Sequence, residues 1–509
     1  MEATFGLILS SIVVAASLTW AAKLLNTFWL RPRKIEKLLR EQGLGGNPYR
    51  LIVGDMTDFM KSINEEQPKS IEISDAHMPH VLAYEHRIIS TYGGGNCFYW
   101  LGPWARLVVT DPELIKEIVR RFDVFVRPFP ELTRTLVGGG LLSAEGEEWV
   151  KRRKIVDHAF HVDKLKDMAP RIVLSCSLMI QKLKAAAATS CELDVWPFIE
   201  DLTGDVISRA AFGSSYEQGT RVFELIRQRV DLTMPLLQFF YLPGYKYLPT
   251  KSNRKVKAIS SEMKTILRGV IHMREKAMER GEDVPKDDLL GILMENSKNG
   301  GLMSIEDVIE ECELFYLAGS KTVAGLLVWT LVMLCAYPEW QTQAREEVNR
   351  VFGNSEPALQ GLHHLKIVTM ILQEVLRLYP TNAVIYRCSS EEVKVGNVTI
   401  PAGVHLSLLI GLIQTDPKIW GDDVNKFNPE RFAQGVAKAT NNQPVFTPFS
   451  SGPRMCIGHN FAMIEAKLAI ATLLQHFSFQ LSPSYKHAPF ALYKLRPQYG
   501  APLILRPLH

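Results

Sequence analysis

The sequence predicts a mainly α-helical protein with a smaller number of short strands and an apolar helix at its N-terminus. Residues 160–300 show helical periodicity with charged faces, and another helical pattern starts after Ser304. Strand patterns are short, as in CFYWLGPWARLVVT, which has a Gly-Pro turn in its middle and ends at Thr110. The run from Phe5 to Ala22 carries no charge, and its length is close to the minimum for a membrane span.

Composition limits the classes of function. The chain has 509 residues, enough for one large domain or two to three average ones, and 47% of them are hydrophobic. The formal net charge of +4 gives no reason to expect a nucleic-acid partner. The seven cysteines are scattered without a C-x-x-C pair, which favours reduced thiols in a protein that faces the cytosol.

The residues that flank the apolar run predict an uncleaved membrane anchor. Aromatic residues suited to a membrane interface stand at its end: Trp20, Phe28 and Trp29. A lone Glu2 precedes the run and basic residues follow it, which predicts a cytoplasmic body: Lys23, Arg31, Arg33 and Lys34. A cleaved signal peptide, the alternative, would need a basic start and an oxidising destination. We expect an anchor over 1–30, a basic Pro/Gly linker over 31–48 and one catalytic domain over 49–509.

The stretch FSSGPRMCIG, from Phe449 to Gly458, places one cysteine between glycines. Gly452 permits a tight turn before Cys456, and a periodic helical run begins after Gly458. A cysteine just before a helix N-terminus is stabilised as a thiolate. Such a thiolate is a nucleophile or a metal ligand, and the surrounding sequence shows no histidine base paired with it. A buried structural cysteine in a glycine-rich turn is the alternative.

Two pairs of polar residues lie at helical spacing. Trp149 and Arg153 are four residues apart and share a helix face, where an indole N–H and a guanidinium suit a carboxylate. A surface cation–π pair is the alternative interpretation. Glu374 and Arg377 are three apart, which predicts an ion pair on one face.

Five segments occur in an order that resembles the cytochrome P450 superfamily: WVKRR, AGSKT, EVLR, FNPERF and FSSGPRMCIG. The strings LREQGLGGNPYRL, KIVTMILQEVLRLYP and RPQYGAPLIL are similar to one plant clan of it, which includes secologanin synthase and hydroxylases of triterpenoids, steroid hormones and gibberellins. The resemblance implies the cytochrome P450 fold, mostly helical with a smaller β-rich lobe. It also implies one haem b, buried between helices.

The resemblance assigns roles to particular residues. Cys456 would be the protein ligand of the haem iron, within a haem-binding segment that matches the family at Phe449, Gly452, Arg454 and Gly458. One haem propionate would be bound by Trp149 and Arg153, and Arg387 would reach the other propionate. The pair Glu374 and Arg377 would join Arg431, from FNPERF, in a buried structural network.

The segment AGSKT matches the family pattern A-G-x-[D/E]-T at Ala318, Gly319 and Thr322. In the family the helix bulges here over the iron, and the threonine assists protonation of oxygen. Without the resemblance, a mid-helix threonine would simply bond its own backbone. Lys321 replaces the usual acid and is expected to point about 100° away from Thr322, towards solvent or a channel. A protonated lysine does not relay protons as a carboxylate does, so water or another acid such as Glu313 would serve.

The resemblance implies a monooxygenase that hydroxylates a lipophilic plant specialised metabolite or hormone, a terpenoid or steroid-like compound, at the endoplasmic reticulum membrane. The residues after Cys456 leave no room for a flavin domain, so electrons would come from a separate NADPH-dependent cytochrome P450 reductase, with cytochrome b5 as a second candidate donor. A basic face with Lys151, Arg152 and Lys154 would dock the reductase. Alternatives are a haem-thiolate isomerase, dehydratase or oxidative cyclase, suggested by Lys321, and a non-catalytic haem electron carrier.

Overall fold

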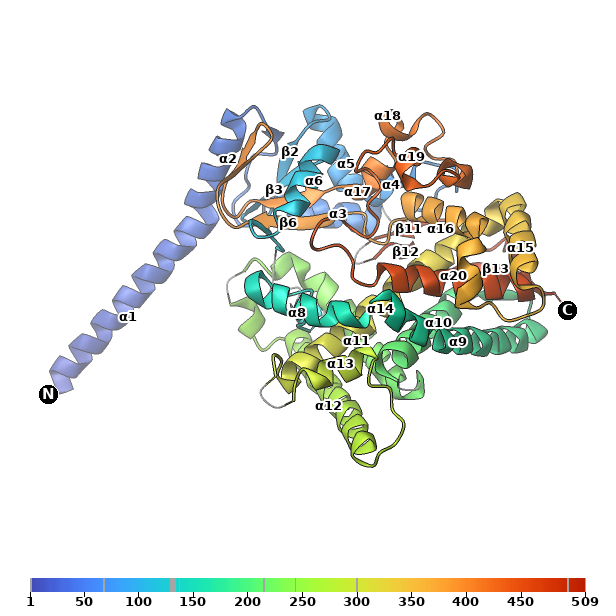
Figure 1. Cartoon of the computed structure of the whole chain (residues 1–509). Coiled ribbons are helices and arrows are strands. Elements are labelled where there is room, and N and C mark those ends of the chain that lie inside the picture. The colour runs from blue at the N-terminus through green and yellow to red at the C-terminus, as the bar shows by residue number, and fades with distance from the viewer. Residues whose placement is uncertain are drawn as a thin grey trace.

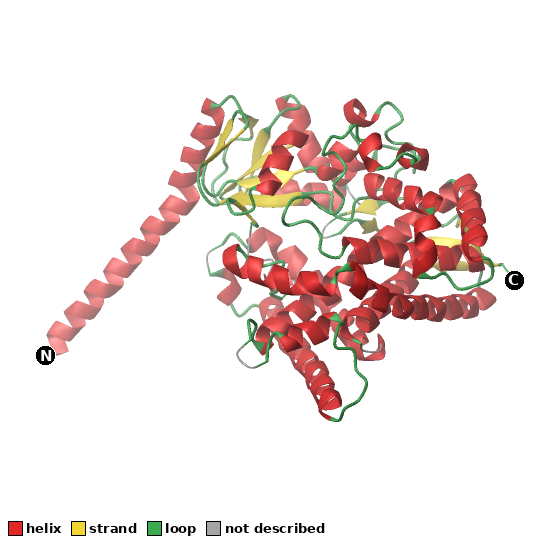
Figure 2. Cartoon of the chain, viewed as in Figure 1, coloured by secondary structure: helices red, strands yellow, loops and turns green. Residues whose placement is uncertain are grey.

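The computed structural model shows an N-terminal helical rod attached to a large helical body (Figure 1). The structure describes residues 2–66, 69–128, 134–136, 138–213, 216–242, 244–298, 301–491 and 494–508. Helices dominate the body, and the strands gather mainly beside the base of the rod (Figure 2). This arrangement agrees with the predicted fold class.

The bounds of the elements follow the chain. The described helices after the rod are α3 Met56–Glu65, α4 His77–Val81, α5 Ala83–Tyr92, α6 Pro112–Arg120, α8 Gly146–Ala159, α9 Val162–Thr189, α10 Val195–Phe212, α11 Tyr216–Thr233, α12 Lys251–Glu279, α13 Leu289–Glu295, α14 Ile305–Ala336, α15 Pro338–Phe352, α16 Lys366–Leu378, α17 Ile410–Gln414, α18 Pro417–Trp420, α19 Val436–Ala439 and α20 His459–His476. Short 3-10 turns connect them: η2 Met234–Phe239, η3 Tyr245–Tyr247, η4 Leu359–His364 and η5 Pro429–Phe432.

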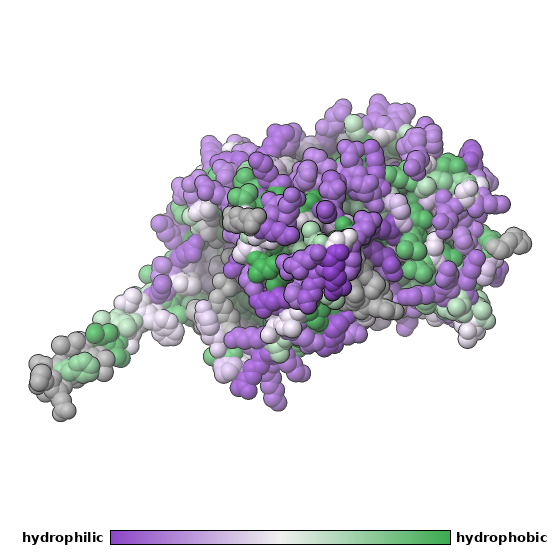
Figure 3. Space-filling view, turned by 60° about the horizontal axis from the view of Figure 1, so that its bottom comes forward, coloured by the Kyte–Doolittle hydropathy of each residue, from purple (hydrophilic) through white to green (hydrophobic). Residues whose placement is uncertain are grey.

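The rod consists of α1 Glu2–Leu25, the π-helical segment η1 Asn26–Leu30 and α2 Arg31–Glu41. By length and composition it is one of three described helices apolar enough to cross a membrane, and its apolar window is 0% buried. The other two belong to α9 and α14, whose windows are 33% and 78% buried inside the body. Figure 3 shows the apolar colouring on the rod against a largely hydrophilic face of the body. The rod is therefore the exposed candidate for a membrane span.

The stretch 31–48, expected as a linker, packs against the body. Its helix α2 buries Pro32, Ile35 and Leu39. The following strand, β1 Gly45–Gly46, pairs in parallel with β2 Cys97–Leu101. This stretch therefore fixes the base of the rod to the sheet.

The largest sheet has six strands in the order β1-β2-β3-β9-β6-β4. Its hairpin β2–β3, with β3 Trp104–Val109, matches the two strands predicted around the Gly-Pro turn. β3 pairs in parallel with β9 His405–Leu408, which pairs antiparallel with β6 Ile385–Ser389. The remaining strands are β4 Phe125–Val126, β5 Glu192–Asp194, β7 Val393–Val395, β8 Val398–Ile400, β10 Phe477–Leu481, β11 Pro489–Phe490, β12 Arg496–Pro497 and β13 Pro502–Pro507.

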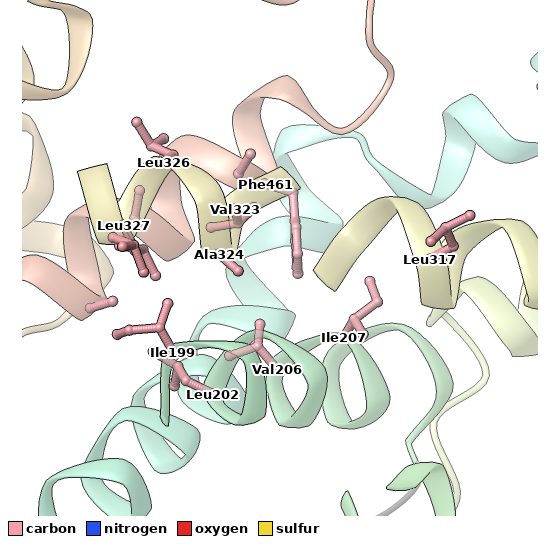
Figure 4. Packing of buried hydrophobic residues seen from close by; sticks show 14 of the residues in the cluster. Ile199, Leu202, Val206, Ile207, Leu317, Val323, Ala324, Leu326, Leu327 and Phe461 are labelled. Atoms are coloured by element: carbon pink, nitrogen blue, oxygen red, sulfur yellow. The ribbon is translucent and has the colours of Figure 1, made fainter. Parts of the chain in front are cut away.

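Helix α14 runs through the centre of the body. The predicted cap is present as a full capping box, in which Ser304 and Asp307 bond each other's backbone N–H groups. The helix packs against α10, where Ile199, Leu202 and Val206 face it (Figure 4). A Cβ at Gly319 would lie 2.6 Å from Ile207 Cδ1, so this glycine allows the two helices to approach closely.

Candidate functional site

A tight loop holds Cys456 directly before α20. The Cys456 N–H donates to the Phe449 carbonyl at 2.9 Å, and the Met455 N–H donates to that of Gly452 at 3.0 Å. Gly452 has φ +71°, and a Cβ there would meet the Val119 carbonyl at 2.9 Å. Only glycine fits that backbone without strain. Gly458 is the N-cap residue of α20, so the cysteine stands at the positive end of this helix, as predicted.

Burial and three neighbouring groups set the pKa of the Cys456 thiol. Burial is the largest influence and raises the pKa above its ordinary value, while a backbone hydrogen bond from Gly458 and the cations of Lys494 and Arg153 partly offset this rise. The thiol is nevertheless accessible, although protein surrounds it on most sides. The Gly458 N–H and the two cations would favour a thiolate, although burial outweighs them, and the sulfur is accessible to a ligand.

The indole of Trp149 lies against the same loop. Trp149 is 5% exposed, and the Arg454 guanidinium lies over its ring at 4.5 Å. Trp149 therefore makes its cation–π contact with Arg454 and not with Arg153. Arg153 instead donates to the Met455 carbonyl at 2.7 Å. Both members of the predicted pair therefore border the cysteine loop.

Further arginines converge on this place. Arg454 bonds Glu145 and the Ala144 carbonyl, yet its buried Nε has no partner in the described part of the chain. Arg387 on β6 is 4% exposed, and its Nε is likewise unpartnered. The pKa of Arg387 is lowered to about 10, mainly by burial and also by the charge of Arg454. Buried cations with unused donors mark a place for an anionic group.

Arg127 belongs to the same cluster, and the sequence analysis missed it. Its pKa is lowered to about 9, mainly by burial and also by the charges of Arg454 and Arg387. Its side chain donates to the Leu142 carbonyl. No motif surrounds Arg127 in the sequence. Arg127 directly follows β4, and it comes close to Arg387 only because β4 pairs with β6. Arg127, Arg153, Arg387 and Arg454, here named the arginine cluster, surround the cysteine loop.

Ala318 and Thr322 lie on the accessible side of α14. Ala318 is exposed although the neighbouring Leu317 and Ser320 are buried, so this face of the helix is accessible at Ala318. The Thr322 hydroxyl donates to the Ala318 carbonyl at 2.6 Å. The helix is α-helical throughout its length, so the bulge that the resemblance implied is absent from this structure.

Lys321 does not point to bulk solvent, which was one of the two directions expected for it. Its ammonium forms an ion pair with Glu200 of α10, and the two side chains are 19% and 16% exposed. Burial lowers the pKa of Lys321, and Glu200 partly offsets this. Arg227 of α11 lies 3.9 Å from the same carboxylate. A carboxylate therefore stands next to position 321 although α14 does not supply it.

Two other expectations about charged residues need correction. Glu313, considered as a substitute acid, forms a buried ion pair with Arg229 at 3.0 Å, each side chain being 1% exposed. Arg152, expected on the basic docking face, is 7% exposed and pairs with acids of α14. These partners include Asp307, Glu310 and Glu311. Such groups are committed to helix packing.

The predicted network of Glu374, Arg377 and Arg431 forms. Arg377 makes two hydrogen bonds to the Glu374 carboxylate, at 2.7 and 2.8 Å, and both side chains are fully buried. Arg431 Nε lies 3.8 Å from Glu374 Oε1, while its Nη2 pairs with Asp423 at 2.9 Å. The network joins α16 to η5.

The part of the chain that matches known proteins includes the residues of this site. The cytochrome P450 family model matches residues 83–493. Cytochrome P450 CYP72A219 of Panax ginseng is 48% identical over 521 residues, covering 100% of both chains. Echinocystic acid 23-monooxygenase of Saponaria officinalis is 46% identical over 519 residues, covering 98% of both chains. 7-Deoxyloganic acid hydroxylase of Catharanthus roseus is 46% identical over 524 residues, covering 100% of both chains.

Proposed function

Because this chain belongs to the cytochrome P450 family, we propose that it is a membrane-bound enzyme that hydroxylates a lipophilic terpenoid with electrons from a separate NADPH-dependent reductase. The family binds haem b, and the chain is a cytochrome P450 monooxygenase of the plant CYP72A type. The observation that carries the proposal is the accessible Cys456 thiol, held at the N-terminus of α20 beside the arginine cluster.

The residues present fit haem b. Its two propionates match the unused donors of Arg387 and Arg454, with Arg127, Arg153 and the Trp149 indole beside them. The Cys456 thiolate would be the iron ligand, and the Gly458 N–H would hydrogen-bond its sulfur. When bound, a thiolate-ligated haem supplies the activation of dioxygen.

Residues of α14 would handle protons next to the substrate. The Thr322 hydroxyl can accept a hydrogen bond at Oγ1 while it donates to the Ala318 carbonyl. The ion pair with Glu200 of α10 brings a carboxylate to the ammonium of Lys321, the residue before Thr322 in the chain. The alternative of a haem-thiolate isomerase was suggested because Lys321 replaces the usual acid. The carboxylate of Glu200, which pairs with Lys321, weakens that argument.

The membrane attachment is supported by an apolar pocket at the base of the rod. Its volume is about 540 Å³, and residues of α1 and η1 share its lining with loops of the body: Trp20, Leu24, Leu25, Phe28, Trp29, Leu51, Ile52 and Leu242. Such a surface, continuous with an exposed apolar helix, suits the acyl region of a bilayer. We place the protein in the endoplasmic reticulum membrane, with one span over residues 1–30 and the catalytic domain over 49–509 in the cytoplasm.

The reductase would dock beside the cysteine loop. Lys151 and Lys154 are exposed on α8, the helix that also carries Trp149 and Arg153. A basic surface near the redox centre would steer an acidic flavoprotein, or cytochrome b5, into place. Arg152 takes no part in this surface because it is buried.

The terpenoid substrate class is supported by the relatives, two of which are named for the oxidation of acids. Both align with essentially the whole chain. The position oxidised in this protein depends on how the substrate lies against Ala318 and Thr322.

The thiolate assignment is tested by Cys456→His in the full-length protein. We expect the long-wavelength Soret band of the ferrous carbon monoxide complex to disappear, because that band requires a thiolate ligand. Cys191→Ser, which changes an exposed cysteine elsewhere, is the matched control and should retain the band. A Cys456→His protein that still shows the band would contradict the proposal. The hydroxylation itself is tested by incorporation of labelled dioxygen into product with an added reductase and NADPH.

A further inference from the structure

Lys494 is held at a defined place near α14. The next residue, Leu495, donates its N–H to the Thr381 carbonyl at 3.2 Å and accepts from Trp329 Nε1 at 3.4 Å. The Lys494 ammonium donates to Asn382 Oδ1 at 2.6 Å. The strand pair β11–β12 and α14 therefore fix the backbone from which this side chain extends.

The Lys494 ammonium lies within electrostatic range of the cysteine loop and of the arginine cluster. The charges that act on it come from Cys456 and Arg127, and Lys494 in turn lowers the pKa of Cys456. Burial lowers the pKa of Lys494 itself to about 8, with Cys456 raising it and Arg127 lowering it, so the ammonium is largely protonated near pH 7.

The same segment also reaches the proton-handling part of α14. Thr381, the neighbour of Asn382, donates its hydroxyl to the Thr322 carbonyl at 3.4 Å. One side of the site thus carries Lys494, Asn382 and Thr322 together. These two hydrogen bonds connect the cation, through residues 381 and 382, to the turn of α14 that carries Thr322.

We propose that the Lys494 ammonium, positioned by Asn382, binds the carboxylate of an acidic substrate and so orients it beside Thr322. This inference rests on the proposed monooxygenase function. An ammonium has three N–H donors, so it can hold the Asn382 amide and a carboxylate together. In an enclosed site a charged hydrogen bond of this kind exceeds one to a neutral group, because less water competes for either partner.

Two roles can be distinguished for such a cation. The arginine cluster already offers donors that suit the two haem propionates, and Lys494 extends from a different segment, held by Asn382. A lysine that held a propionate would affect retention of haem. A lysine that holds substrate would affect the preference for acids over neutral compounds.

The test uses ω-imidazolyl alkanoic acids of increasing chain length, each paired with its methyl ester. The imidazole binds the haem iron and shifts the Soret band, so binding of every probe to the full-length holoenzyme is measured without turnover. We expect one range of lengths to bind at least about tenfold more tightly as the acid than as the ester, which corresponds to about 1.4 kcal/mol. Lys494→Met should bring this ratio close to one, and Lys494→Arg should largely preserve it.

Lys486→Met is the matched control, because Lys486 is an exposed lysine shortly before the same strand pair. It should leave the ratio of acid to ester affinity unchanged. Equal affinities at all lengths in the wild type, or an acid preference that survives Lys494→Met, would overturn the proposal. Loss of haem from Lys494→Met with an unchanged ratio would overturn it too and assign Lys494 to a propionate. If no probe shifts the Soret band and the carbon monoxide band is missing, the haem-thiolate function fails instead.

Discussion

At the scale of single residues, Lys321 shows how a departure from a family pattern can be compensated from another element. The lysine lies where the resemblance expects an acid, and it is largely buried. A buried ammonium is costly without a counter-charge, and Glu200 of α10 supplies one. A carboxylate is therefore still present at this position, but α10 supplies it instead of α14.

Reversing one charge of this pair should destabilise the protein. Lys321→Glu places two carboxylates together, and we expect a loss of roughly 3 kcal/mol in the free energy of unfolding. The double variant Lys321→Glu with Glu200→Lys should recover most of it. Thermal unfolding of the holoprotein measures both.

The control for this cycle is Lys182→Glu, which changes an exposed pair between Lys182 and Asp201 at 3.8 Å. It should cost less than about 1 kcal/mol, as exposed pairs do. If the double variant is no more stable than Lys321→Glu alone, the pair does not account for the burial of the lysine.

At the scale of elements, the ion network between α16 and η5 holds the segment that leads to the cysteine loop. The Glu374 carboxylate accepts hydrogen bonds from Nε and Nη2 of Arg377, and it accepts a third from the Asn428 N–H at 3.0 Å. Arg377 also donates to the carbonyls of Gln414 and Val424. One buried carboxylate thus organises three chain segments.

Removal of that carboxylate charge should be severe. Glu374→Gln leaves the fully buried Arg377 without its counter-charge, and we expect a loss of about 3–5 kcal/mol in stability. The measurement is chemical unfolding, together with the fraction of expressed protein that retains haem. Glu430→Gln, an exposed acid on η5, should behave as the wild type. Wild-type stability of Glu374→Gln would mean that the backbone contacts alone hold η5 in place.

At the scale of the whole molecule, the rod and the body meet through two kinds of contact. Residues 31–48 join the body by buried side chains and by the pairing of β1 with β2. The apolar pocket at the junction takes residues from both parts. The boundary of the exposed span therefore lies before α2, close to residue 30.

Deletion of residues 1–30 should leave a folded haem protein that is released from membranes at least in part. The remaining apolar loop residues Leu51 and Ile52, 51% and 42% exposed, should keep some affinity for the bilayer. Adding Leu51→Ser and Ile52→Ser to the truncated protein should complete the release, as measured by flotation with liposomes. A truncated protein that stays fully bound even with both serines would place the main anchor elsewhere in the body.

Much of the site could be predicted from the sequence because its residues lie close together along the chain. FSSGPRMCIG contains the turn, the ligand and the start of α20, and local backbone rules fix their geometry. The capping box at Ser304 and the hairpin β2–β3 were predictable for the same reason. Helical spacing likewise determined that Glu374 and Arg377 share one face.

Only the tertiary structure decided which distant charges meet. Arg127 joins the arginine cluster through strand pairing, Glu200 reaches Lys321 across two helices, and Lys494 comes to the site from near the C-terminus. Tertiary packing also buries Arg152, which the helical pattern alone would leave on the surface. The physical reason is that desolvation and ion pairing depend on where separate elements pack, and a periodicity along one helix carries no information about the charges of its neighbour.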